Sequence, residues 1–380
     1  MTEINRIVLK QTALYDFKNV NATILGENIF SYRKVKIPKK RGYRTIFIPD
    51  PELMRIQRII LRFLKKVRGS WHSNFYGLHR GSYVDHANNH KDQRWILQFD
   101  IKDAFQSVNT ELLRQILLKE FTRKIDYYQS VVNRYHRDLE SLEELKKEFS
   151  EDDDWPELEK NEKEDVKHSR KDMIFSPFYP LFGEEKIIIE DSARKLTDLI
   201  ISLTIFENIL PQGTPTAPFL FYTYLAESDA ILGMMRGIPE FWREQWQIKW
   251  GISCYVDGFV LSCNRLLPIE VREKILKAIE ESGLKVNEDK TRYQDCRHGA
   301  VMITGLVVDG TGKVRLPKKV VRKWRGIIHR AARETDMEKK KELAKRIEGF
   351  VASLKPIYGA AIPRQIITPL NKLNSPLKEY

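Results

Sequence analysis

The stretch that most constrains the fold is GISCYVDGFVLSC, residues 251–263, in which two β-rich runs flank Asp257-Gly258. An Asp-Gly pair between such runs predicts a β-hairpin with a two-residue turn. In that register Val256 pairs with Phe259, and the apolar side chains share one face because successive side chains alternate. We expect that face to bury against a second layer, with Tyr255 and Asp257 near the tip. The alternative is an ordinary hairpin whose Asp simply suits a turn.

A second carboxylate occurs in a similar setting upstream. WILQFDIKDAF, residues 95–105, is typical of a buried strand that ends at Asp100 and leads into a helix from about Asn109. If this strand lies beside the hairpin, Asp100 and Asp257 form a hard oxygen site suited to Mg²⁺. Ions held there can activate a hydroxyl and stabilise a phosphate leaving group, which indicates nucleotidyl transfer. Asp residues at strand ends are common, so the spacing alone leaves a structural interpretation open.

Charge narrows the class of partner. The 380-residue chain has a net charge of +13, which favours a polyanion: nucleic acid first, an anionic membrane surface second. Residues 137–170 hold 14 Asp and Glu against 7 Lys and Arg, so this segment carries −7 and the remainder +20. A basic body with one acidic insert is typical of a polynucleotide-binding surface, and the insert itself is expected to be a solvated appendage.

Cysteine usage and hydropathy bear on location. Three cysteines are too few, and odd in number, for a disulfide framework, which predicts a reducing, cytoplasmic location. The first residues, MTEINRIVLKQTALYDF, have no long apolar core, so no signal peptide is expected. The most apolar stretch, residues 199–210, is short and contains Glu207, so we expect no membrane span.

The other patterns mix strands and helices and favour an α+β fold. In the first half they predict a basic hairpin over 31–49 with its turn at 39–42, a helix opening at Asp50-Pro51-Glu52, a Gly-punctuated loop over 75–90 and a charged insert over about 125–190. In the second half they predict a helix over 192–206, a Pro/Gly loop feeding an apolar helix over 210–232, and a helix over 271–283 followed by a strand and a turn. The last predicted elements are a strand-rich segment over 301–317 with an Asp-Gly turn at 309–310 and two basic helices over 318–354.

The order of these motifs resembles the reverse transcriptases, particularly the bacterial enzymes of the retron, group II intron and phage-defence groups. The resemblance covers about residues 35 to 355 and rests on FDIKDAF (99–105), LPQG (210–213), YVDG (255–258), NEDKT (287–291) and ITGL (303–306). It implies a right-hand polymerase. The N-terminal segment and fingers would occupy 1–98, a palm with an antiparallel sheet backed by helices 99–310, and a helical thumb 311–380. The palm would include part of the fingers and the acidic insert.

The resemblance also implies a catalytic set. Asp100 and Asp257 would be the catalytic metal ligands for Mg²⁺, with Mn²⁺ as a substitute, and the carbonyl of Ile101 would be a further ligand. Lys290 would lie near the triphosphate of the nucleotide. The alternative for Lys290 is a solvated turn residue.

A substrate set is implied in the same way. Phe105 would stack under the incoming sugar and exclude a 2′-hydroxyl, while Gln212 and Gly213 would shape the nucleotide and template pocket. Tyr255 belongs to the catalytic hairpin, and Arg44 is a candidate phosphate contact. Plain core packing is the alternative for Phe105, and a generic surface charge is the alternative for Arg44.

Two departures from the family pattern stand out. HANNH, residues 86–90, lies where retron enzymes carry a related Asn-Ala-x-x-His motif, with His86 in place of Asn. Its histidines suggest zinc, but no second cluster completes a tetrahedral set, so we expect no metal there. Gly258 stands where the family has a second Asp. Either Asp100 and Asp257 suffice as ligands, or catalysis is lost. Asp103 is a weak substitute, because on a strand end it should point differently.

These observations predict an RNA-directed DNA polymerase that uses dNTPs, a structured RNA template and a DNA product, acting with a dedicated non-coding RNA in a retron-like or anti-phage system. One alternative is a decayed RNA-binding subunit that partners an active polymerase. Another is a template-independent or protein-primed DNA polymerase. A homo-oligomer or a partner protein stays open, and no membrane partner is expected.

Overall fold

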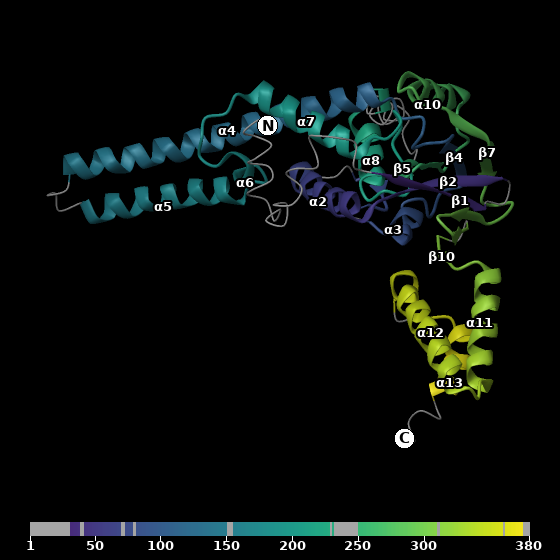
Figure 1. Cartoon of the computed structure of the whole chain (residues 1–380). Helices are drawn as coiled ribbons and strands as arrows, with labels where there is room; N and C mark the ends of the chain where they lie inside the picture. Colours follow the sequence, from purple (N-terminus) through teal and green to yellow (C-terminus); the bar gives the residue numbers. More distant parts are fainter. Residues whose placement is uncertain are drawn as a thin grey trace. The chain divides into compact units, whose positions relative to one another are not determined.

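The computed structural model describes residues 31–38, 42–69, 73–78, 81–149, 155–228, 230–231, 250–309, 312–359 and 362–374. The chain divides into two compact units, Met1–Ser70 with Asp103–Ser228, and Trp71–Lys102 with Asp229–Tyr380. Helices and strands occur in both units, which confirms the predicted α+β class (Figure 1).

The first unit contains a two-stranded sheet and six helices in its described residues. They are β1 (Tyr32–Pro38), β2 (Tyr43–Pro49), α2 (Pro51–Arg68), α4 (Thr110–Phe149), α5 (Trp155–Phe175), α6 (Tyr179–Phe182), α7 (Ile189–Thr204) and α8 (Ala217–Glu227). The β1–β2 pair closes between Pro38 and Tyr43, which confirms the predicted basic hairpin. Its turn residues 39–41 lie outside the described residues.

Helix α2 begins where the sequence predicts. The Asp50 carboxylate accepts hydrogen bonds from the backbone amides of Glu52 and Leu53 at 3.1 and 2.9 Å. These contacts satisfy amides that have no partner within the helix, and Pro51 needs none. The apolar face of α2 packs with Leu203 of α7 in one core cluster.

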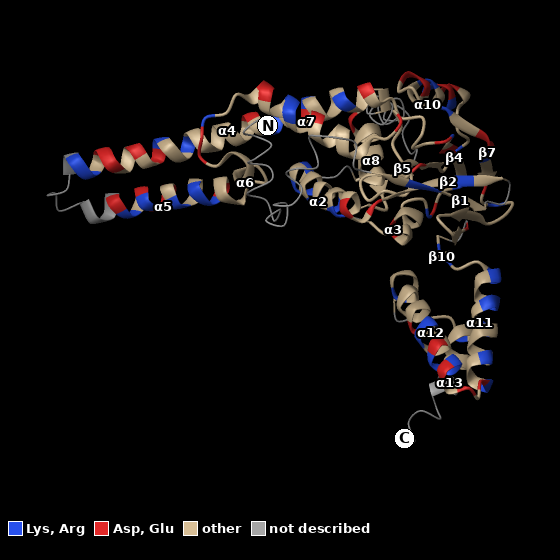
Figure 2. Ribbon diagram, viewed as in Figure 1, with Lys and Arg blue, Asp and Glu red and all other residues tan. Residues whose placement is uncertain are grey.

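The charged insert is a pair of long helices, α4 and α5, that pack side by side (Figure 1). Their seam is apolar, with Val132 and Met173 at 1% and 0% exposure. Arg134 on α4 pairs with Asp172 on α5 at 2.6 Å. Charged residues of both signs alternate along both helices (Figure 2). The prediction of charged helical sequence is therefore confirmed. The sequence also predicts a loop over SEDDDWPELE, residues 150–159, which is wrong for 155–159, because α5 begins at Trp155. Residues 150–154 lie outside the described residues.

The second unit is built on a five-stranded sheet of order β3-β5-β6-β4-β7. Its described elements are β3 (Phe75–Tyr76), α3 (Tyr83–Asn88), β4 (Trp95–Ile101), β5 (Trp250–Tyr255), β6 (Gly258–Cys263), α10 (Ile269–Glu281), β7 (Val286–Asp295), β8 (Val301–Ile303), β9 (Leu306–Val308), β10 (Val314–Arg315), α11 (Lys318–Arg333), α12 (Met337–Tyr358) and α13 (Arg364–Asn374). Strand β3 is parallel to β5, and the other neighbours are antiparallel.

Two further layers belong to this unit. Helix α3 and the small sheet β8–β10 form a core cluster with Ile96 of β4 and Val260 of β6. Helices α11, α12 and α13 form a cluster of their own, in which Trp324 stacks on Phe350 with ring centroids 4.1 Å apart. The predicted basic helices over 318–354 are thus present. Gly310 of the predicted turn at 309–310 lies outside the described residues.

The length and hydropathy of the helices bear on membrane insertion. Within the part of the chain that the structure describes, none is both long enough and apolar enough to cross a bilayer.

Candidate active site

The β5–β6 hairpin differs from the predicted register. Tyr255 pairs with Gly258 and Cys254 with Phe259, so the turn is Val256-Asp257 instead of Asp257-Gly258. The predicted pairing of Val256 with Phe259 is therefore wrong by two residues. Because side chains alternate, a shift of two keeps every residue on its predicted face. Cys254 and Phe259 are 0% and 1% exposed, which confirms the buried apolar face.

The reason for this register lies in the neighbouring strand. Strand β4 draws Gly258 into the ladder opposite Asp100, and the Ile101 amide donates to the Asp257 carbonyl at 3.1 Å. Tertiary pairing thus overrides the local preference of Asp-Gly for the turn. The left-handed conformation falls on Val256, with φ of 60°, and not on Gly258. A β-branched residue rarely adopts this conformation, so the tip is strained.

The register brings the two predicted carboxylates to one end of the sheet. Asp100 lies opposite Gly258 on one side and Asn287 on the other, while Asp257 directly precedes Gly258. A Cβ added at Gly258 would lie 3.2 Å from Asp100 Oδ1, so the missing side chain would point at Asp100. Any carboxylate at 258 would therefore share the environment of Asp100.

Lys290 joins this group from β7. Its ammonium donates to Asp100 Oδ2 at 2.8 Å, and both side chains are partly exposed. Lys290 lies within β7, which runs from Val286 to Asp295, and so does not fit the alternative of a turn residue. The pairing with β4 is irregular here, because Gln98 pairs with Arg292 and Asp100 with Asn287, and Lys290 reaches Asp100 through its side chain.

The pKa of the Cys254 thiol is affected by the negative charge of the site. Burial raises the pKa of its thiol well above the usual range, and the charges of Asp257 and then Asp100 raise it further. Both carboxylates thus act on one buried atom. The thiol stays protonated at neutral pH and behaves as an apolar filler beneath the hairpin.

The donor set fits a divalent cation in its chemistry. Asp100 and Asp257 supply carboxylate oxygens, which Mg²⁺ prefers. Across the described residues, no group of three or more His, Cys, Asp or Glu side chains is arranged to hold a metal. This agrees with a glycine at 258, where a third carboxylate would otherwise stand.

The predicted pocket residues lie in the first unit. The Phe47 amide of β2 donates to the Gln212 carbonyl at 2.8 Å. Gly213 has φ of 109°, and an added Cβ would come within 2.3 Å of Ile46 Cγ2. Only glycine therefore lets the 210–213 loop approach β2 this closely. Arg44 is exposed on the same strand.

Phe105 is 8% exposed and packs on Phe221 of α8, with ring centroids 5.3 Å apart. Asp103, in the same unit, has a left-handed φ of 45°, and its carbonyl accepts from the amides of Gln106 and Ser107. Asp100, Ile101, Tyr255, Asp257 and Lys290 all belong to the second unit.

Sequence reasoning missed one set of residues beside the hairpin. His90 lies between Ser253 and Ser262, and His86 lies against the ring of Tyr255. The HANNH motif marked both histidines, but their serine partners are more than 160 positions away. Only the folded sheet brings them together.

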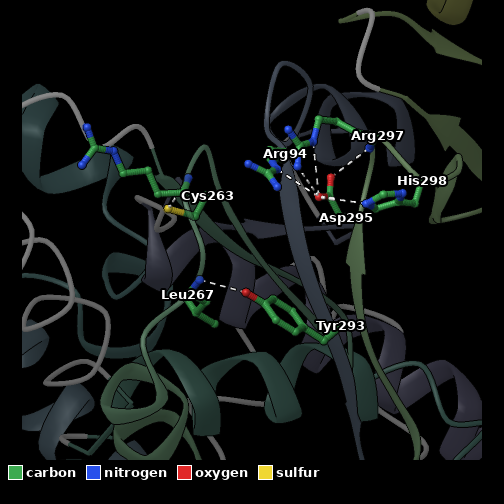
Figure 3. Close-up of polar contacts among 8 residues, drawn as sticks. Arg94, Cys263, Leu267, Tyr293, Asp295, Arg297 and His298 are labelled. Carbon is green, nitrogen blue, oxygen red and sulfur yellow. Dashed lines mark hydrogen bonds and ion pairs between the residues drawn. The ribbon is translucent and has the colours of Figure 1, made fainter.

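The opposite end of β4 is fixed by a charge cluster (Figure 3). Arg94 Nε donates to Asp295 Oδ2 at 2.9 Å, and Arg297 Nη2 donates to the same oxygen at 3.2 Å. Tyr293 accepts from the Leu267 amide at 2.8 Å. The Arg94–Asp295 contact joins the start of β4 to the end of β7, far from Asp100, and so supports the register that aligns the carboxylates.

Comparisons with known proteins find similarity to reverse transcriptases. Residues 37–149 match the family model described as "Reverse transcriptase (RNA-dependent DNA polymerase)". A retron Mx65 reverse transcriptase from Myxococcus xanthus is 25% identical over 192 residues, which is 49% of this chain and 42% of the relative. The chain thus matches less than half the length of that protein.

Solved structures with detectable likeness include telomerases. The apo telomerase of Candida tropicalis truncated from its C-terminal domain is 13% identical, with a TM-score of 0.42 over 77% of this chain and 56% of that one. The Candida albicans telomerase in complex with a fragment of telomeric RNA is also 13% identical, with a TM-score of 0.43 over 95% of this chain and 63% of that one.

Over residues 37–149 the chain is therefore similar to the reverse transcriptases, a family of RNA-directed DNA polymerases. The family-model match includes Arg44, Asp100 and Phe105 and ends before the β5–β6 hairpin. Reverse transcriptases generally use divalent metal ions, a nucleic acid template and dNTPs.

Proposed function

We propose that this protein is an RNA-directed DNA polymerase that acts with a dedicated, structured non-coding RNA in a retron-like or anti-phage system. The observation that carries the proposal is the pairing of β4 with β6, in which Asp100 lies opposite Gly258, the residue after Asp257. Two carboxylates at one sheet end, in a chain of net charge +13, suit a polymerase that binds a polyanion.

The site residues of the second unit each have a role in this proposal. Asp100 and Asp257, with the Ile101 carbonyl, hold Mg²⁺, or Mn²⁺ in its place, and the bound ions supply the Lewis acidity for nucleotidyl transfer. Lys290 is an exposed ammonium beside Asp100 and is placed to contact a phosphate. Tyr255 packs at the base of the tip and supports Asp257.

Four residues of the first unit have substrate-binding roles in this proposal. Gln212 and Gly213 shape the nucleotide and template pocket against β2, Arg44 contacts a phosphate, and Phe105 selects the sugar. We keep fingers (1–98), palm (99–310) and thumb (311–380) as the functional division. Helix α11 fits a nucleic-acid-binding thumb, because it carries Lys and Arg throughout and no Asp or Glu.

The competing functions follow from Gly258. A decayed subunit would bind RNA beside an active polymerase, and a template-independent or protein-primed enzyme would extend without copying RNA. Sequencing the nucleic acid that co-purifies with the protein, followed by dNTP extension on it, separates the three. DNA complementary to a bound RNA supports our proposal if Asp100→Asn abolishes it. Bound RNA with no extension at any Mg²⁺ or Mn²⁺ concentration supports the decayed subunit.

Phe105 tests the choice of sugar. If its ring packs under the ribose, Phe105→Val opens room for a 2′-hydroxyl, and the preference for dNTP over rNTP falls by about tenfold or more, about 1.4 kcal/mol. Steady-state incorporation of matched dNTP and rNTP measures this. Phe221→Leu is the control, because it loosens the same aromatic pair from α8. An unchanged preference in a folded Phe105→Val protein would assign Phe105 to core packing alone.

A further inference from the structure

A buried polar network lies under the second face of the β5–β6 hairpin. His90 is 0% exposed, with Nδ1 2.7 Å from Ser262 Oγ on β6 and Nε2 2.6 Å from Ser253 Oγ on β5. One imidazole therefore ties the two strands together. A neutral ring has one donor and one acceptor nitrogen, and a serine hydroxyl can serve as either, so both contacts are satisfied. Burial, and then the neighbouring His86, lower the pKa of His90 to about 3.

His86 extends this network toward the tip. It is 1% exposed, and its ring lies between Tyr76 and Tyr255, with centroid distances of 5.2 and 5.5 Å. Neither ring nitrogen has a hydrogen-bond partner among the described residues. Its contribution therefore comes from the ring as a packing surface.

Glycines allow the loop to close on the hairpin. A Cβ added at Gly77, where φ is 91°, would lie 2.9 Å from Tyr255 Cζ, and one at Gly251 would lie 3.3 Å from the Asn89 carbonyl. Tyr255 is thus packed between Gly77 and His86. It stands two residues before Asp257, separated from it only by the strained Val256.

We propose that His86 and His90 are positioning residues that hold Asp257 in place for the reaction. His90 fixes the two strands relative to each other, and His86 fixes Tyr255, so that the tip keeps one conformation despite the left-handed Val256. A strained residue persists only where its surroundings determine it, and this network supplies that constraint. This inference rests on the proposed polymerase function, because its kinetic tests measure polymerase activity.

His90 is tested by two matched variants. His90→Leu leaves the hydroxyls of Ser253 and Ser262 buried without partners, so both stability and kcat fall, the latter by about 10- to 100-fold. Adding Ser253→Ala and Ser262→Ala removes those orphan hydroxyls and restores most of the stability. The triple variant should still have a low kcat with KM for dNTP unchanged. Recovery of kcat together with Tm would show a purely structural role and overturn the proposal for His90.

His86 is tested by ring shape. His86→Phe keeps the ring and removes two unpartnered nitrogens, so kcat should stay within about twofold of wild type and Tm should not fall. His86→Leu removes the ring and should lower kcat about tenfold at unchanged KM. Equal activity of the two variants, or loss in the Phe variant, would overturn the role of the His86 ring.

Hydrogen exchange provides a readout that needs no activity. The Ile101 amide donates to the Asp257 carbonyl, so its exchange rate reports how firmly the tip is held. His90→Leu and the triple variant should speed it at least tenfold. His86→Phe should not, and the Phe47 amide, bonded to Gln212, serves as the control in every variant. Unchanged Ile101 exchange refutes the positioning role. An inert wild type whose exchange responds as expected refutes the polymerase proposal alone.

Discussion

Two hairpins of this protein are built on opposite physical principles. The β1–β2 hairpin exposes most of β1 and the first two residues of β2 and is rich in Lys and Arg, and its closing residues Pro38 and Tyr43 pair as local sequence predicts. The β5–β6 hairpin is buried over most of both faces and carries its strain at Val256. In the first, the strand pairing follows the local sequence pattern. In the second, the neighbouring strand β4 sets the register.

The difference shows where each hairpin can tolerate change. In an exposed hairpin, replacing a Lys or Arg removes one solvated charge, whose interaction energy is small and depends on salt. A buried hairpin holds its groups by packing and directional hydrogen bonds, so one substitution disturbs several neighbours. We therefore expect large effects on chemistry and stability from β5–β6, and small effects on affinity from β1–β2.

The largest effect is expected at the tip of β5–β6. Asp257→Asn removes a carboxylate from the proposed metal site and should lower the rate of dNTP incorporation by about three orders of magnitude or more. Asp289→Asn, an exposed acid on β7, is the matched control and should change the rate less than threefold. Single-turnover extension at saturating Mg²⁺ measures both. Similar rates for wild type and Asp257→Asn would place the chemistry elsewhere.

Acid should weaken the buried hairpin through its histidines. Burial lowers the pKa of His86 from 6.5 to about 4, and burial with His86 lowers that of His90 to about 3. The unfolded chain then binds more protons below pH 6.5, so stability is full above that pH and falls as pH drops toward 4. Each histidine contributes about 1.4 kcal/mol per pH unit in this window. Denaturant unfolding from pH 7 to 4.5 measures it.

The contribution of one histidine can be isolated by difference. His86→Phe cannot bind a proton, so its stability should depend on pH less steeply than that of wild type by about 1.4 kcal/mol per unit between pH 6 and 4.5. All other groups are common to both proteins, so the difference between the two stability curves isolates His86. Parallel stability curves would mean that His86 is accessible to protons in the folded state.

A smaller effect is expected from restoring a third carboxylate. In Gly258→Asp the new side chain starts 3.2 Å from Asp100 Oδ1, so the two like charges repel without metal and share it when it binds. We expect about tenfold tighter Mn²⁺ binding and a lower Tm in chelator. Gly258→Asn is the control, with similar volume and no charge. Weaker Mn²⁺ binding in Gly258→Asp than in Gly258→Asn would contradict the site.

The smallest effect is expected on β1–β2. Arg44→Ala should reduce the slope of log affinity for RNA against log salt by about one unit, because one phosphate contact is lost. Its dNTP incorporation rate at saturating RNA should stay within about threefold. Arg33→Ala on the paired strand removes the same charge at another position, so comparing the two salt slopes shows whether the position of the arginine matters. A slope unchanged by Arg44→Ala would assign this arginine to the solvated surface.

The sequence by itself determined a good deal of this protein. Alternation in residues 251–263 gave the two faces of the hairpin correctly, and Asp50-Pro51 gave the start of α2, because these signals act within a few residues. The motif order predicted that Asp100 and Asp257 act together, and the structure places both at one end of the sheet. The long helix from Asn109 into the insert also followed from local pattern alone.

Tertiary structure decided the register and the support of the site. Asp-Gly favours a turn by a small local margin, whereas pairing Gly258 with Asp100 completes a ladder shared with β4, and the larger gain prevails. Lys290 contacts Asp100 through its side chain, from the stretch of β7 where the pairing with β4 is irregular. His90 finds Ser253 and Ser262 only when β5 and β6 lie side by side, because hydrogen bonds between distant residues leave no trace in local sequence.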